Sequence, residues 1–205
     1  MLDRNIEKCI QKVAGFYDLK KVGDIGPLGF RRSTDLTRLC SCIENLIDQK
    51  ILVPGESLFL DMGCGDGRVN VLFSYLVKRS IGIEVDKWTL DEYIPLKKEL
   101  EAVLEKDSLP LPPDNISLFH GDSMDKNIHK SIYQETGLSF EYFDLFYTYL
   151  TMHEELAELI AHRGKKNAIF MIYGLNRITP RLDGFEQLTG HEPMHEILAV
   201  YRRIN

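Results

Sequence analysis

The fold is decided by the stretch Phe59-Leu60-Asp61-Met62-Gly63-Cys64-Gly65-Asp66-Gly67-Arg68-Val69, in which an apolar run leads into an acid and then into three glycines at alternate positions. Glycine has no Cβ and accepts positive φ, so the main chain can turn sharply and a ligand can lie against its amides. From Val69 onward the apolar spacing changes from that of a strand to that of a helix. The glycines are therefore predicted to form a loop between a strand and a helix N-terminus, where α/β folds bind nucleotides.

The spacing of the glycines restricts the kind of nucleotide. A dinucleotide-binding fingerprint requires its third glycine where this chain has Arg68, and a phosphate-binding P-loop requires a Gly-Lys-Ser or Gly-Lys-Thr ending that is absent here. Asp61, two residues before the first glycine, places a carboxylate beside the loop, where it repels phosphate and attracts an ammonium group. The sequence therefore predicts a zwitterionic or cationic ligand.

The segment from Asp61 to Gly67, followed by the acid Glu84, resembles motif I and the next acidic position of class I S-adenosylmethionine-dependent methyltransferases. The resemblance extends from about residue 52 to residue 173. It implies that S-adenosyl-L-methionine is the cofactor, that Glu84 accepts hydrogen bonds from both ribose hydroxyls, and that Asp122, at the end of a third strand, meets the adenine amino group. The cofactor-binding residues implied in this way are Asp61, Gly63, Cys64, Gly65, Gly67, Glu84, Val85, Asp122 and Ser123.

Each of these residues also has a purely structural interpretation. Glycines after a strand often form only a tight turn, and an acid after a short strand, such as Glu84 or Asp122, often serves as a helix N-cap. Asp66 is expected to be structural, and the Cys64 side chain to fill a small space. The order and the spacing of the motifs together favour the cofactor site.

The methyl acceptor is expected to approach the carboxyl end of the fourth strand, predicted over residues 143–149. The candidate catalytic residues there are Tyr147, Thr148 and Tyr149, with Asp144 as a further residue to consider. The chain lacks the Asn/Asp-Pro-Pro-Tyr sequence that amino-methylating DNA enzymes carry at this place, which argues against methylation of adenine N6. The layout is weakly similar to small protein-lysine methyltransferase-like proteins, and tyrosines can hold a cation and orient an amine. Equally, Tyr147 and Tyr149 could be buried strand residues.

The leading functional hypothesis is methyl transfer to a protein side chain such as lysine. The alternatives are a methyltransferase acting on a small metabolite or RNA, and a non-catalytic module that only binds S-adenosylmethionine. Nucleic acid is a less favoured partner because the net charge is −6, although four basic pairs leave it open. Those pairs are Lys20-Lys21, Arg31-Arg32, Lys165-Lys166 and Arg202-Arg203.

The composition fits one α/β domain. The chain has 205 residues, 44% of them hydrophobic, and no apolar run of about 20 residues that would span a membrane. No secretory pattern opens the chain and the four cysteines form no CxxC motif, so we expect reduced thiols and a cytoplasmic location. A His-Glu-x-x-His string occupies residues 191–195, but Pro193 would disturb the helix that a zinc site requires, so no metal is expected.

Apolar periodicity predicts two helices within residues 1–50, packed on a core formed by residues 51–205. Between these helices, residues 23–29 are predicted to be a flexible loop, and Ser33 or Thr34 to cap the second helix. Arg31, Ser33 or Thr34 could also touch the carboxylate of the cofactor. Strands and helices then alternate. This predicts a Rossmann-like fold of the class I methyltransferase kind, with a mostly parallel sheet of six or seven strands and helices on both faces.

Overall fold

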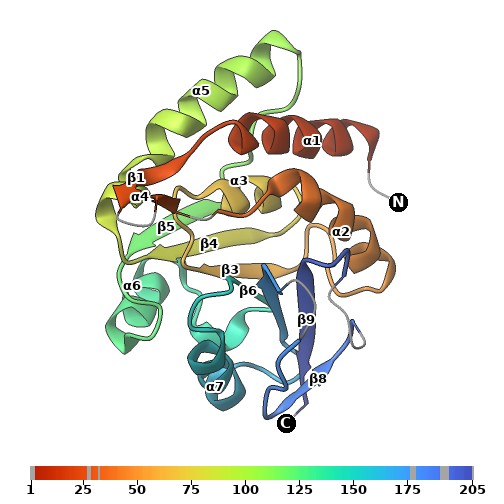
Figure 1. Ribbon diagram of the computed structural model, residues 1–205, viewed down its shortest axis with the longest axis vertical. Helices are drawn as coiled ribbons and strands as arrows, with labels where there is room; N and C mark the ends of the chain where they lie inside the picture. Colours follow the sequence, from red (N-terminus) through yellow and green to blue (C-terminus); the bar gives the residue numbers. More distant parts are fainter. Residues whose placement is uncertain (1–2, 27–28, 32, 176–178, 190–193, 205) are drawn as a thin grey trace.

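The computed structural model describes residues 3–204 apart from 27–28, 32, 176–178 and 190–193, and it describes no side chains between residues 23 and 31. A seven-stranded sheet with the order β5-β4-β3-β6-β7-β9-β8 forms the centre of the molecule (Figure 1). Strands β3 to β7 are parallel, and β9 is antiparallel to both of its neighbours. The strands are β3 (Leu58–Met62), β4 (Arg79–Glu84), β5 (Ile116–His120), β6 (Leu145–Tyr149), β7 (Ile169–Tyr173), β8 (Phe185–Gln187) and β9 (Leu198–Arg203).

The register of the parallel strands brings the predicted site residues to one edge of the sheet. Asp61 on the central strand β3 lies between Gly82 of β4 and Tyr147 of β6. Glu84, at the end of β4, is paired with His120 at the end of β5. Carboxyl ends of parallel strands meet at a common edge, so the loops that follow β3, β4, β5 and β6 surround the same space.

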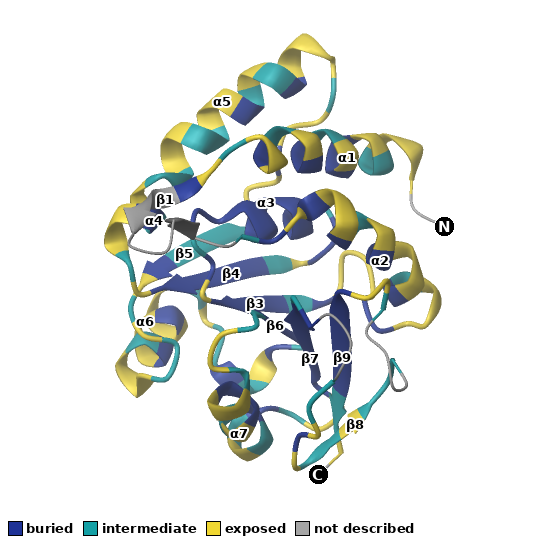
Figure 2. Ribbon diagram, in the orientation of Figure 1, coloured by how far each residue is buried: buried dark blue, intermediate teal, exposed yellow. Residues whose placement is uncertain are grey.

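Helices cover both faces of this sheet, as Figures 1 and 2 show. Alternate strand residues supply two apolar cores: one is shared with α1, α2, α3 and α5, and the other with α6 and α7. Helix α3 is buried along its whole length and contacts α1 and the sheet (Figure 2). The helices are α1 (Arg4–Asp18), α2 (Leu36–Asp48), α3 (Arg68–Ser74), α4 (Lys87–Asp91), α5 (Tyr93–Lys106), α6 (Lys126–Thr136), the short 3₁₀ helix η1 (Phe140–Tyr142) and α7 (His153–Arg163).

The predicted fold class is confirmed, including the two helices that precede the sheet. The helical pattern after β4 is divided into α4 and α5, and Pro95 lies in the first turn of α5, where its missing N–H removes no helical hydrogen bond. Asp35 caps α2 by accepting from the amide of Arg38, so the prediction of Ser33 or Thr34 as the cap was wrong.

Four elements differ from the expectation or were absent from it. Residues 23–29, predicted to be a loop, belong largely to an antiparallel pair, β1 (Val22–Gly26) and β2 (Gly29–Arg31). The glycines of β1 and β2 interrupt the alternation of apolar and polar residues that would indicate a strand, whereas the pairing itself uses main-chain groups. Strand β8 has only three residues, too few to show a period. Helix α6 is rich in polar residues and buries only His129 and Ile132, so its sequence shows too few apolar residues at helical spacing to predict a helix.

All four cysteines are free thiols, and three of them, Cys9, Cys42 and Cys64, are buried. The half-buried Cys40 places its Sγ 3.9 Å from the carbonyl oxygen of Ile10. Of the helices that the structure describes, none has the length and apolar content needed to cross a bilayer.

We predict that Gly67→Ala lowers the free energy of unfolding by about 2 to 4 kcal/mol. Gly67 has φ +76°, and a Cβ added there would lie 2.7 Å from Leu118 Cδ1 and 2.8 Å from Tyr93 Cδ2. The control is Gly15→Ala in α1, where a Cβ meets nothing within 4 Å and should stabilise the helix by roughly 0.5 to 1 kcal/mol. Urea denaturation measures both changes, and equal stabilities for the two variants would contradict the prediction.

Candidate functional site

The glycine loop after β3 turns back on itself in a left-handed conformation. Gly63, Gly65 and Gly67 have φ values of +99°, +57° and +76°, a region that other residues enter at a free-energy cost. The amides of Gly63 and Cys64 both donate to the carbonyl oxygen of Ile83 at 2.9 Å, which ties the loop to the end of β4. The loop is therefore a fixed surface whose glycines carry no side chains.

A cavity of about 600 Å³ opens beside this loop. Its walls come from the loops that follow β3, β4, β5 and β6, and from Val22, Ser33 and Thr34 of the N-terminal segment. Of the nine cofactor-binding residues and the three residues Tyr147, Thr148 and Tyr149 predicted from the sequence, eleven line the cavity. They are Asp61, Gly63, Cys64, Gly65, Glu84, Val85, Asp122, Ser123, Tyr147, Thr148 and Tyr149. Gly67 does not line it and instead precedes α3, as its N-cap.

Asp61 is the residue with the least satisfied polar group in this cavity. Only 1% of it is exposed, and neither of its carboxylate oxygens has a hydrogen-bond partner among the described residues. Burial, together with the negative charges of Glu84 and Asp66, raises the pKa of Asp61 well above its ordinary value. Such a carboxylate is stabilised by a cation that enters the cavity, and the ammonium group of S-adenosyl-L-methionine fits this requirement.

Glu84 combines a structural contact with a place in the cavity wall. Its Oε2 accepts from the amide of Gly65 at 2.9 Å, and its Oε1 accepts from the amide of Asp86 at 2.8 Å. Both oxygens of Glu84 are thus engaged by main-chain amides, which ties β4 to the glycine loop and fixes the carboxylate in the cavity wall.

The remaining cofactor candidates lie at the rim or in the floor of the cavity. Asp122 is exposed, and its Oδ1 accepts from the amide of Met124 at 2.8 Å, the structural role that an acid after a strand often has. Ser123 is half-buried, and Val85 is 67% exposed. Cys64 is buried, and burial raises the pKa of its thiol, so it is a neutral part of the floor.

The three residues at the end of β6 lie in different environments. Tyr147 is buried, and its hydroxyl is 2.7 Å from Thr34 Oγ1. Thr148 points to the opposite face of the sheet and donates to the carbonyl oxygen of Met62 at 3.0 Å. Tyr149 is half-buried, with its ring centroid 5.6 Å from that of Tyr173.

Burial raises the pKa of Tyr147 far above the ordinary value, although the hydrogen bond to Thr34 opposes the shift, so this phenol stays protonated. Asp144, considered from the sequence as an acceptor-side residue, does not reach the cavity. It precedes β6 at the opposite edge of the sheet, where it accepts from the Leu58 amide and pairs with Lys165.

Arg68 is a residue of the cavity that the sequence did not indicate as functional. It is only 3% exposed and forms an ion pair with Asp66, with Nη2 and Oδ2 2.9 Å apart. Asp66 is thus structural, as expected. In the sequence, Arg68 is noticeable only as the residue at the position of the third glycine of a dinucleotide-binding motif. Its partners are distant in sequence and become visible only in the fold.

The His-Glu-x-x-His string is described only in part, because His191, Glu192 and Pro193 lie outside the described residues. His195 has φ +50°, which is not helical, and its Nε2 lies 3.2 Å from Asn45 Nδ2. Within the described part of the chain, no three histidines, cysteines or acids are grouped as metal ligands would be. The side chain of Arg31 is also outside the described set.

Comparison with known proteins relates this architecture to solved structures, whereas no family profile and no curated protein sequence matches the chain. An RNA methyltransferase from Salinibacter ruber, in complex with S-adenosyl-L-homocysteine, superposes with a TM-score of 0.52 at 15% identity, covering 85% of this chain and 95% of the other. At such a low sequence identity, the similarity shows a shared fold and nothing more. The chain has the class I methyltransferase fold.

Two further structures share the class I methyltransferase fold with this chain. A candidate protein-L-isoaspartate O-methyltransferase from Plasmodium falciparum, in complex with S-adenosyl-L-homocysteine, has a TM-score of 0.52 at 19% identity, covering 84% of this chain and 77% of the other. A candidate methyltransferase from Escherichia coli has a TM-score of 0.51 at 13% identity, with coverages of 89% and 90%. We therefore assign this fold to the sheet of the chain, in which β9, next to the last strand in the order, is the one reversed strand of those described.

We predict that Asp61→Asn raises the free energy of unfolding of the ligand-free protein by about 1 to 3 kcal/mol at pH 7. The folded-state pKa of Asp61 lies above its unfolded value, so ionisation opposes folding. The wild type therefore loses stability as the pH rises from about 4 through that raised pKa, and the variant does not. Urea titrations at a series of pH values test this, and a variant less stable than the wild type at pH 7 would contradict it.

Proposed function

We propose that this protein is an S-adenosyl-L-methionine-dependent methyltransferase. The observation that carries the proposal is the buried Asp61 carboxylate, whose oxygens have no partner in the described chain and which lines one cavity together with the glycine loop of a class I methyltransferase fold. A group that costs stability at such a position is retained when a ligand uses it. The cationic amino-acid end of S-adenosyl-L-methionine has the charge that this position lacks.

The proposed cofactor contacts divide along the cavity. Asp61 binds the ammonium group, and the exposed main chain of Gly63 and Gly65 lies against the amino-acid part. Glu84 accepts hydrogen bonds from the ribose hydroxyls, and Asp122 accepts one from the adenine amino group. Cys64, Val85 and Ser123 complete the wall by contact, and Gly67 acts indirectly by starting α3.

When bound, S-adenosyl-L-methionine would supply a methyl group on a positively charged sulfur, which would keep the C–S electron pair as the methyl carbon bonded to a lone pair of the acceptor. A lysine acceptor would have that lone pair only as the neutral amine, after its ammonium group had released a proton to bulk solvent. The chain has to exclude water and to align the acceptor. In the described wall after β6, the cavity presents tyrosine and threonine hydroxyls and apolar groups, without histidine or acid. We propose that Tyr149 orients the acceptor, that Tyr147 forms the wall held by Thr34, and that Thr148 anchors the strand end rather than reacting.

The acceptor that we propose is a protein side chain, with lysine as the best candidate. The tyrosines after β6 offer aromatic surface to an alkylammonium chain. Exposed acids near the cavity also favour a basic partner: Asp122 lines it, Asp125 is the N-cap of α6, and Glu154 and Glu155 lie in the first turn of α7. A basic protein segment is attracted to such a rim, whereas an RNA backbone is repelled.

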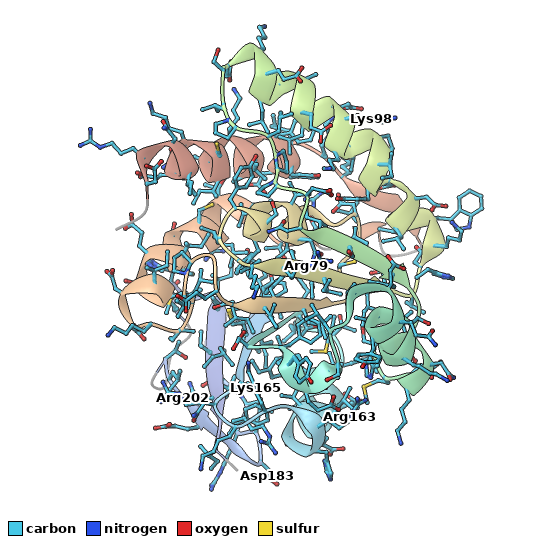
Figure 3. All side chains as sticks on the ribbon, turned by 180° about the vertical axis from the view of Figure 1, so that it is seen from behind. Arg79, Lys98, Arg163, Lys165, Asp183 and Arg202 are labelled. Atoms are coloured by element: carbon cyan, nitrogen blue, oxygen red, sulfur yellow. The ribbon has the colours of Figure 1, made fainter. Side chains whose placement is uncertain are left out.

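Three of the four basic pairs have a described member that is held in an ion pair, whereas the side chains of Arg31 and Arg32 lie outside the described residues. Lys165 and Arg202, labelled in the lower part of Figure 3, lie at the other end of the strands, in ion pairs with Asp144 and Glu186. Lys20 pairs with Glu99 at 2.5 Å. Cations neutralised in this way release few counterions on binding nucleic acid, so they contribute little affinity.

The alternatives remain distinct from this proposal. Structural neighbours carry names that refer to RNA and to protein isoaspartate, so the fold does not select the acceptor. A non-catalytic module would be favoured if the tyrosines sealed the mouth, but the cavity continues past Tyr149 to Met152 and Leu156. We also propose the cytoplasm as the compartment, on the basis of composition and free thiols alone.

We predict that Glu84→Ala weakens the binding of S-adenosyl-L-homocysteine by about 1 to 3 kcal/mol, because the ribose loses a charged acceptor and the loop loses a tie. Isothermal titration calorimetry measures the change. Glu186→Ala is the control, since Glu186 lies on β8 at the far end of the sheet and should leave affinity unchanged. A wild-type protein that binds no S-adenosyl-L-homocysteine, or equal affinity after Glu84→Ala, would contradict the proposed cofactor site.

For the acceptor, we predict that methyl-labelled cofactor transfers its label to the protein fraction of a cell extract, where acid hydrolysis recovers it as methyl-lysine. The double substitution Glu154→Lys and Glu155→Lys, which reverses charge at the rim, should lower the label by several-fold through repulsion of a basic substrate. Label that disappears on nuclease treatment would replace protein by RNA as the acceptor. Label in no fraction, with cofactor binding intact, would favour the non-catalytic module.

A further inference from the structure

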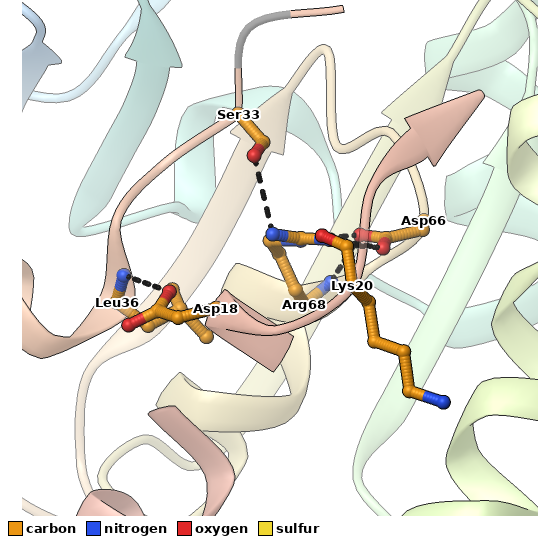
Figure 4. Close-up of polar contacts among 6 residues, drawn as sticks. All are labelled: Asp18, Lys20, Ser33, Leu36, Asp66 and Arg68. Carbon is orange, nitrogen blue, oxygen red and sulfur yellow. Dashed lines mark hydrogen bonds and ion pairs between the residues drawn. The ribbon is translucent and has the colours of Figure 1, made fainter. Parts of the chain in front are cut away.

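Every nitrogen of the Arg68 guanidinium has a partner, and these partners come from separate parts of the chain (Figure 4). Nε and Nη2 donate to the two carboxylate oxygens of Asp66, at 3.0 and 2.9 Å, as a bidentate pair. Nη1 donates to Ser33 Oγ at 3.2 Å, and Nη2 also donates to the carbonyl oxygen of Lys20 at 3.3 Å. One buried group thus joins the glycine loop to two distant positions of the N-terminal segment.

Lys20 and Ser33 stand at the two ends of one excursion of the chain, which leaves α1, forms β1 and β2, and returns to α2. The described residues at both ends of this excursion, Val22, Ser33 and Thr34, line the cavity. A Cβ added to Gly65 would be 3.8 Å from Val22 Cγ1, so this wall lies close to the glycine loop. Arg68 therefore contacts the chain at each place where the excursion joins the site.

Other contacts fix the same two ends to each other but not to the loop. Asp18 Oδ1 accepts from the amide of Leu36 at 2.8 Å and Asp18 Oδ2 from that of Thr37 at 2.9 Å, which binds the end of α1 to the start of α2 (Figure 4 shows the first). The ring of Tyr17 lies under the guanidinium, with its centroid 5.5 Å from Arg68 Cζ. The described polar links from these ends to the glycine loop run through Arg68 and Asp66.

We propose that Arg68 is a positioning residue: with Asp66 it anchors both ends of the excursion against the glycine loop and so sets the wall that Val22, Ser33 and Thr34 give to the cavity. The role in cofactor binding rests on the proposed function, whereas the anchoring itself does not. Lysine cannot replace Arg68 in this role, because one ammonium group cannot hold the Asp66 fork, Ser33 and the Lys20 carbonyl in their separate directions.

Anchoring is tested without any ligand, by amide hydrogen exchange of Arg68→Lys. The amides of Lys20, Asp35 and Leu36 are protected by Tyr17 O, Tyr173 Oη and Asp18 Oδ1, and they lie next to the anchored positions. We expect their exchange to become about three- to tenfold faster, with β3 and β4 amides unchanged. The control is Arg203→Lys on β9, which loses donations to Ala161 O at the far edge of the sheet. Equal exchange in both variants would overturn the proposal.

The positioning role is tested by the affinity for S-adenosyl-L-homocysteine. Arg68→Lys should weaken binding at least about fivefold, and the milder Ser33→Ala, which removes one partner, about two- to threefold, while Arg203→Lys has no effect. The Ser33→Ala variant keeps the test available if Arg68→Lys fails to fold. Faster exchange with unchanged affinity in both variants would overturn the positioning role. If the wild type does not bind S-adenosyl-L-homocysteine, the proposed function is overturned instead. The anchoring role of Arg68 is then decided by the hydrogen-exchange experiment alone.

Discussion

An uncompensated carboxylate at the centre of the sheet edge is the constraint on which the site depends. Three acids surround the glycine loop, and the chain treats them differently. Asp66 is neutralised by Arg68, and Glu84 accepts two main-chain amides. Asp61 has no such partner among the described residues, although it is the most central of the three. An unpaired buried charge opposes folding, so we attribute the presence of an acid at position 61 to a ligand that it binds. The local excess of negative charge favours a cationic ligand.

The rest of the fold serves to hold this charge in place. Its neighbours in register, Gly82 and Tyr147, belong to strands that are themselves paired on both sides, so Asp61 cannot move toward solvent. The amides of the loop are held by Ile83, and the opposite wall of the cavity comes from the N-terminal segment through Arg68. The site is thus assembled from strands, a loop and an excursion distant in sequence, and its rigidity comes from their mutual contacts.

The sequence predicted those parts of the structure that local patterns encode. The glycine loop, the acids near the ends of β3 and β4, and the alternation of strands and helices follow from periodicity and from the restrictions on glycine. Three aspects could not be predicted this way. The β1–β2 pairing has almost no side-chain signal, Asp144 reads as a residue near the site although it lies at the other end of β6, and the partners of Arg68 are 35 and 48 residues away. Each depends on tertiary placement, which no local pattern contains.

The most direct test of the account is a crystal structure of the protein soaked with S-adenosyl-L-homocysteine. The account predicts that the amino nitrogen of this compound lies within hydrogen-bond distance of the Asp61 carboxylate, with the ribose hydroxyls against Glu84. A compound bound elsewhere, or an Asp61 carboxylate that forms no contact with the bound molecule, would contradict it.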